Sequence, residues 1–70
     1  MYSNNIYMVA NAIKNNPKRM AKLNGIPRFY DKVNKAKGYV VAECQAQKIR
    51  LNEDDIRMAA VLISEYKGKG

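Results

Sequence analysis

Two prolines, Pro17 and Pro27, lie ten residues apart and limit the first half of this chain to short helices. Proline pushes the residue before it out of the α region, so a preceding helix ends there. Proline is also favoured in the first turn of a helix, where its missing N–H has no partner to lose. The spacing therefore predicts helix boundaries near residues 15–16 and 26, and the two helices that begin at these prolines form a compact helix, turn, helix unit.

Capping residues and apolar spacing define the first three helices. Ser3 is the expected N-cap of the first, and Asn16 and Pro17 open the second. The second helix is expected to end with Gly25 as a left-handed stop, and the third to open at Pro27 and end at Gly38. The apolar stripe of the first helix follows the i, i+3, i+4, i+7 pattern and consists of Ile6, Val9, Ala10 and Ile13.

Residues 39–51 carry two competing patterns. Val40, Ala42, Cys44 and Ala46 alternate with more polar residues, which is typical of a strand. The segment is nevertheless rich in Ala, Glu, Gln and Lys, which favour helices. We predict a helix here and keep the strand as the alternative.

The most apolar helix is predicted at about residues 53–67. Asn52 is its expected N-cap, the acidic triplet at residues 53–55 complements the positive end of the helix dipole, and Gly68 ends it. A metal site in this triplet is not expected, because three adjacent carboxylates at a helix start converge poorly on one ion. The apolar stripe of this helix consists of Ile56, Ala59, Ala60, Ile63 and Tyr66.

The length of the chain sets the fold class. A 70-residue core is marginal, and with one cysteine and no histidine neither an internal disulfide nor a zinc cage supports it. We predict one all-α domain over residues 1–70, a small bundle of four to five short helices that is completed by dimerisation. The last helix can form part of the chain's own core or a partner-binding surface, and the core is the simpler role. The two roles merge if a second copy of the chain completes the core. The expected dimer interface consists of Ile56, Leu62, Ile63 and Tyr66.

The positive charge is concentrated in the basic half, residues 14–37. This segment holds eight Lys and Arg residues and one acidic residue, Asp31, so it carries the whole net charge of +7. Cations neutralise phosphates and release counterions, which makes such a segment a candidate nucleic-acid-binding surface. A solvated face that keeps a small protein soluble is the other interpretation. The candidate binding residues are Lys14, Lys18, Arg19, Lys22, Arg28, Lys32, Lys35 and Lys37.

One stretch of this segment, Met20-Ala21-Lys22-Leu23-Asn24-Gly25-Ile26, resembles the first helix and turn of a helix-turn-helix DNA-binding unit. In that family a small residue allows close helix packing, as Ala21 would, and a glycine makes the turn, as Gly25 would. The resemblance implies that residues 27–37 form a recognition helix in the major groove. Tyr30 and Val33 have the apolar spacing of that second helix one position early.

These features together predict a cytoplasmic, non-enzymatic DNA-binding protein, such as a transcriptional regulator, that needs no cofactor or metal. Composition does not distinguish DNA from RNA. Phe29 and Tyr30 would stack on the bases of a single-stranded target, but their helical spacing with Val33 predicts that at least one of them lies in the core. The alternative is an adaptor or inhibitor whose cations dock on an acidic protein surface. Cys44 is expected to be a buried hydrophobe, because the chain has no histidine to activate it. No apolar run is long enough to span a membrane.

Overall fold

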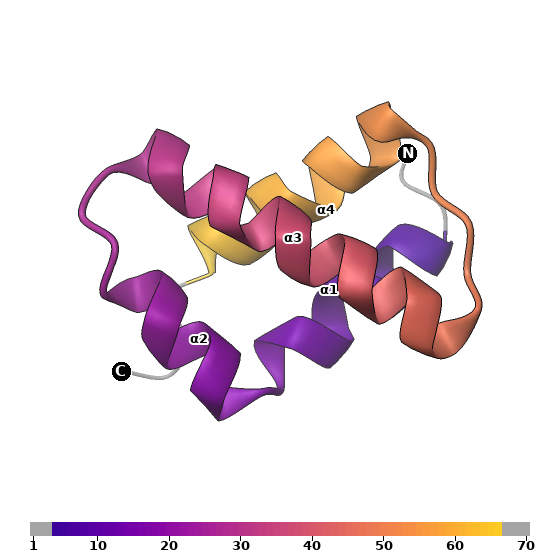
Figure 1. The fold of residues 1–70 in the computed structure, drawn as a ribbon, viewed down its shortest axis with the longest axis horizontal. Coiled ribbons are helices and arrows are strands. Elements are labelled where there is room, and N and C mark those ends of the chain that lie inside the picture. Colours follow the sequence, from indigo (N-terminus) through magenta and orange to yellow (C-terminus); the bar gives the residue numbers. More distant parts are fainter. Residues whose placement is uncertain (1–3, 67–70) are drawn as a thin grey trace.

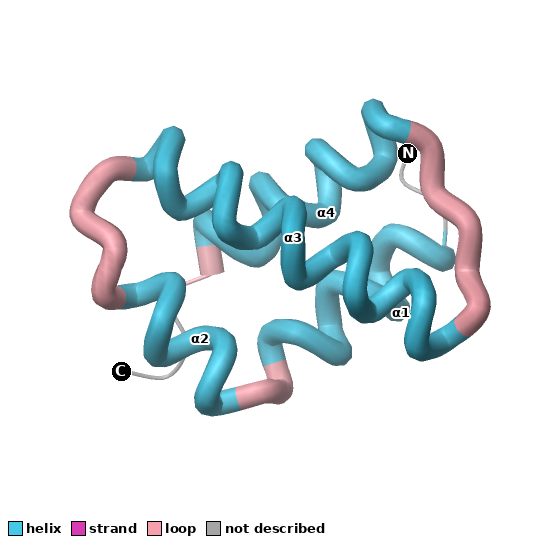
Figure 2. Tube along the Cα trace, viewed as in Figure 1, coloured by secondary structure: helices cyan, strands magenta, loops and turns pink. Residues whose placement is uncertain are grey.

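The computed structural model describes residues 4–66, and every regular element in that range is an α-helix (Figures 1 and 2). The four helices are α1 (Asn4–Lys14), α2 (Pro17–Asn24), α3 (Phe29–Gln47) and α4 (Glu53–Glu65). Helix α3 runs along the long axis of the molecule, and α1 and α3 each pack against all three other helices. The prediction of a small all-α bundle is confirmed, and the strand alternative for residues 39–51 is wrong.

Side-chain caps begin two of the helices where the sequence predicts them. The Asn16 side chain accepts a hydrogen bond from the Arg19 backbone N–H at 3.2 Å, with Pro17 in the first turn of α2. The Asn52 side chain accepts one from the Asp55 N–H at 2.8 Å, and the acidic triplet fills the first turn of α4. Helix α4 ends at Glu65, and the predicted Ser3 cap and Gly68 stop lie outside the described residues.

Helix α3 does not end at Gly38, which is where the sequence analysis places a helix stop. The buried residues Ala36, Val40 and Cys44 lie four residues apart, so one inward stripe continues across the glycine. Packing of this stripe outweighs the cost of glycine in a helix interior, about 1 kcal/mol. The helix ends instead at Gln47, and its C-cap Lys48 adopts the left-handed conformation at φ 57°.

The turn between α2 and α3 also differs from the prediction. Gly25 is right-handed, with φ −78° and ψ −8°, because its N–H and that of Ile26 bond back to Ala21 and Leu23 carbonyls within a continuing turn. Ile26 then packs against the core, and α3 begins only at Phe29, two residues after Pro27. The residue before this helix, Arg28, is extended and has no side-chain capping hydrogen bond.

One hydrophobic core joins all four helices. The predicted stripe of α1 is buried in full, α2 adds two residues to it, and α3 and α4 add three each. Ala21, the small residue that the helix-turn-helix resemblance places between two helices, is exposed. The buried apolar residues are Ile6, Val9, Ala10, Ile13, Met20, Leu23, Ala36, Val40, Cys44, Ala59, Ala60 and Ile63.

Candidate nucleic-acid interface

The fold gathers most of the predicted binding residues at one end of the molecule. Helix α2, the loop at residues 25–28 and the start of α3 lie at this end, and the acidic start of α4 lies at the other (Figure 1). The acidic triplet is therefore held away from most of the basic half. Four of the predicted residues are exposed, namely Lys18, Lys22, Arg28 and Lys35, and four are half-buried, namely Lys14, Arg19, Lys32 and Lys37.

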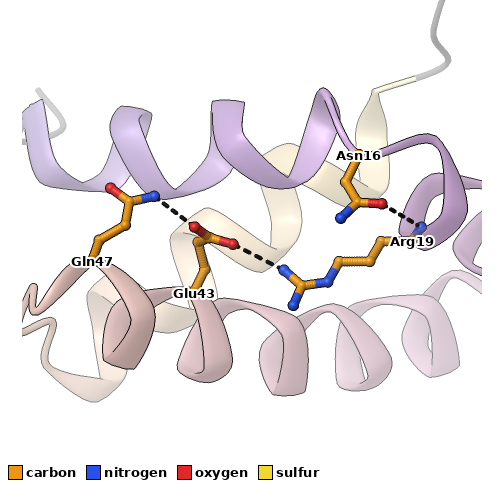
Figure 3. Close-up of polar contacts among 4 residues, drawn as sticks. All are labelled: Asn16, Arg19, Glu43 and Gln47. Atoms are coloured by element: carbon orange, nitrogen blue, oxygen red, sulfur yellow. Dashed lines mark hydrogen bonds and ion pairs between the residues drawn. The ribbon is translucent and has the colours of Figure 1, made fainter.

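Arg19 is committed to holding α2 against α3. Its guanidinium Nη1 donates a 3.0 Å hydrogen bond to Oε1 of Glu43, and Gln47 donates a 2.8 Å bond to Oε2 of the same carboxylate (Figure 3). The Arg19 guanidinium also lies 5.2 Å from the centre of the Tyr39 ring. Among residues 4–66 the contact between Arg19 and Glu43 is the one ion pair, so Arg19 is neutralised within the chain and its seven predicted neighbours are not.

Aromatic rings position two further cations without neutralising them. The Lys35 ammonium lies 5.7 Å from the centre of the Tyr39 ring, and the Lys14 ammonium lies 5.2 Å from the centre of the Tyr66 ring. A ring face attracts a cation through its quadrupole but carries no net charge. Both lysines therefore remain positive toward an incoming anion.

Lys18 and Lys22 are two exposed cations on the same helix. They lie four residues apart on the outer face of α2, whose inner face buries Met20 and Leu23. Like charges at this spacing repel each other and destabilise a helix by a few tenths of a kcal/mol. Arg28, exposed in the next loop, adds a third positive group without a carboxylate within 4.0 Å among the described residues.

Lys37 lies apart from these groups. Lys35 and Lys37 are about 200° apart around α3, so Lys35 faces the α2 side and Lys37 faces α4. There Lys37 lines a groove together with Arg57, a residue that the sequence analysis did not select. Arg57 belongs to a segment without net charge, and only the packing of α3 on α4 reveals its place beside Lys37.

Phe29 and Tyr30 both lie at the surface, 51% and 76% exposed. The expectation that at least one of them belongs to the core is wrong. Helix α3 begins at Phe29, at the end of the bundle, and its inward stripe starts further along the helix with Val33 and Ala36. The two rings therefore flank the basic residues.

The predicted dimer residues of α4 are divided between core and surface. Ile63 is completely buried in the chain's own core, so it presents no surface to a second copy. Ile56 and Leu62 are half-buried against that core, and Tyr66 is 37% exposed beneath Lys14. Dimerisation through this helix therefore stays a prediction, and it depends on Ile56, Leu62 and Tyr66.

The other features that could carry a function are the cysteine, groups of metal-ligating side chains and apolar helices. Cys44 is buried, and loss of water around its thiol, with a smaller contribution from the Glu43 charge, raises the pKa of the thiol. Within residues 4–66 no three His, Cys, Asp or Glu side chains gather closely enough to hold a metal ion. None of the described helices combines the length and the apolar character that crossing a membrane requires.

Comparison with known proteins finds no relative of this chain. No protein-family model matches the chain, and neither a curated protein nor a solved structure shows significant similarity to it. The function is therefore argued from the geometry of the chain itself.

Proposed function

We propose that this chain is a non-enzymatic DNA-binding protein that contacts the phosphate backbone through α2, the loop at residues 25–28 and the start of α3. One observation supports this proposal above the others. The predicted basic residues lie mostly at one end of the fold, and only Arg19 among them is neutralised by a carboxylate within residues 4–66. A surface of unpaired cations is the electrostatic footprint of a partner that carries regularly spaced anions.

The principal contacts are assigned to Lys18, Lys22 and Arg28, because they are exposed and have no anionic partner in the described structure. Lys14, Lys32 and Lys35 lie around them and extend the surface. Arg19 is left out of the binding set because Glu43 already occupies its guanidinium.

A regulator that reads base edges through the start of α3 is the more specific form of the proposal. A helix, a four-residue turn and a second helix follow one another over α2 and α3, but α3 covers Phe29–Gln47 and not the residues 27–37 that the helix-turn-helix resemblance implies. Ala21 is exposed, whereas in that family the corresponding residue lies between the two helices. This difference favours contacts to the DNA phosphate backbone over reading of base edges. A cytoplasmic location also belongs to the proposal, since the free Cys44 thiol suits a reducing compartment.

Fluorescence anisotropy with random-sequence duplex DNA between 50 and 300 mM salt tests the proposal. Each phosphate contact contributes about −0.9 to the slope of log affinity against log salt, so three to five contacts predict a slope of roughly −3 to −5. The double variant Lys18→Gln, Lys22→Gln should weaken binding about tenfold or more at 50 mM salt and flatten the slope by about 2. The matched control is Lys48→Gln, Arg50→Gln, which removes two exposed charges at the other end of the molecule and should change affinity less than about twofold.

Absence of duplex binding at 50 mM salt would overturn the proposal. The basic surface would then be assigned to docking on an acidic protein, the alternative that the sequence analysis leaves open. Such a partner has no condensed counterion layer, so its binding should depend less steeply on salt.

A further inference from the structure

The groove between α3 and α4 combines exposed rings with unpaired positive charge. It has a volume of about 430 Å³, within the range of small-molecule sites and too small for a duplex. Its floor includes Val33 and Val61. The residues that give it chemical character are Phe29, Tyr30, Asn34, Lys37 and Arg57.

The rings present an apolar surface that the fold does not use. Tyr30 is 76% exposed, more than any other large apolar or aromatic side chain in residues 4–66, and the adjacent Phe29 is 51% exposed. Exposed aromatic surface that is rimmed by polar groups marks a binding site more often than a scattered apolar residue does. A planar, apolar ligand group is the natural occupant, because it can stack on a ring face.

The polar residues of the groove set two requirements for its ligand, one for charge and one for hydrogen bonding. Lys37 and Arg57 have no carboxylate within 4.0 Å among the described residues, and none of the residues that line this groove is acidic, so the occupant should be anionic. The Asn34 amide both donates and accepts hydrogen bonds, as recognition of the edge of a base requires. A neighbouring groove shares Lys37 and Arg57 and is also lined by Glu53. The Glu53 carboxylate would repel an anion on that side, so the side toward the two rings is the better place for a phosphate.

We propose that this groove binds a nucleotide unit of a single-stranded nucleic acid, with a base stacked on the Tyr30 ring, the more exposed of the two, and an adjacent phosphate held by Lys37 and Arg57. Planarity and negative charge on neighbouring groups are the properties that distinguish such a strand from an acidic peptide. The inference rests on the nucleic-acid binding in the proposed function, but it does not require that the bound nucleic acid is a duplex. It uses the α4 side of α3, whereas Lys18 and Lys22 lie on α2, so the two surfaces can be tested separately.

The test compares a labelled single-stranded oligothymidylate with a duplex of the same length, by fluorescence anisotropy at 100 mM salt. Tyr30→Leu removes the ring but keeps an apolar side chain, and it should weaken oligothymidylate binding about fivefold or more while leaving duplex binding within about twofold. Tyr30→Phe keeps the ring and should bind like the parent protein. Arg57→Gln should weaken oligothymidylate binding and reduce its salt slope by about 0.7.

Tyr7→Leu is the matched control, because it removes a tyrosine ring that is 44% exposed on α1, outside the groove. It should change neither affinity. Thermal unfolding followed by circular dichroism establishes that each variant is folded before its affinity is interpreted.

Equal oligothymidylate affinities for Tyr30→Leu and Tyr30→Phe would overturn the inference, because the ring would then not be the recognised feature. Duplex binding that depends on Lys18 and Lys22 would leave the proposed function intact in that case. Conversely, Tyr30-dependent oligothymidylate binding without any duplex binding would support the groove and overturn the duplex proposal. If the parent protein binds neither the oligothymidylate nor the duplex, both the groove inference and the proposed function are overturned.

Discussion

Arg19 shows how a residue's partner decides its role. By sequence it is one of eight equivalent cations, and in the fold it joins two helices through Glu43 and Tyr39 (Figure 3). Its side chain is 28% exposed and that of Glu43 is 19% exposed, so the pair is partly shielded from water but not desolvated. Such a pair contributes modestly to stability, near the upper end of the range for surface pairs.

Arg19→Ala should therefore lower the free energy of unfolding by about 1 kcal/mol, because it removes the ion pair and uncovers the Tyr39 ring. Urea denaturation followed by circular dichroism measures this change. The matched variant Lys22→Ala removes one charge from the same helix and, because it ends the repulsion with Lys18, should raise the free energy of unfolding by no more than a few tenths of a kcal/mol. Affinity for duplex DNA should show the reverse order, with the larger loss for Lys22→Ala, and a larger loss for Arg19→Ala would contradict the division between structural and binding cations.

At the scale of the element, α3 is held together by its packing more than by its local sequence. Its only interior glycine lies on the exposed side, where a β-carbon would meet nothing within 4 Å. The inward stripe of Ala36, Val40 and Cys44 passes Gly38 without interruption. The glycine is thus a weak point of a continuous helix, and it has no steric task.

Gly38→Ala should accordingly stabilise the protein by about 0.5–1 kcal/mol, because alanine loses less backbone entropy on entering a helix and finds free space here. The midpoint of urea denaturation should rise with an unchanged dependence on urea concentration. Gly38→Pro is the opposing control and should destabilise by about 3 kcal/mol or more. A neutral or negative effect of alanine would show that residues 29–47 do not form one helix in solution.

Local chemistry explains which elements the sequence predicts correctly. Asn16 and Asn52 cap helices through hydrogen bonds to residues only three positions further along the chain, so the starts of these helices can be predicted from the sequence alone. The end of α3 cannot be predicted in this way, since a lysine adopts the left-handed conformation at position 48 where glycine is the usual residue. The candidate site divides in the same way, because the basic residues are visible in the sequence but the pairing of Arg19 with Glu43, 24 positions away, depends on tertiary packing.

At the scale of the whole molecule, the charge distribution opposes folding as much as it favours an anionic partner. The chain carries a net charge of +7, and its one described ion pair neutralises a single cation of the basic half. The core closes within one chain, so no second copy is needed to bury Ile63 or the stripe of α1. Such a concentration of like charges costs stability through self-repulsion, and it is what the proposed binding function requires.

The double variant Lys18→Gln, Lys22→Gln separates these two effects. It removes a repulsive pair from one helix face, so it should raise the free energy of unfolding by roughly 0.2–0.5 kcal/mol at 20 mM salt while weakening DNA binding. At 1 M salt screening reduces the range of the repulsion to about 3 Å, and the stability difference should disappear. Urea denaturation at both salt concentrations provides the measurement, with Lys48→Gln, Arg50→Gln as the control of equal charge. A destabilising effect that persists at 1 M salt would mean that the two lysines support the fold through their aliphatic stems, and the basic surface of α2 would then have a structural explanation that needs no partner.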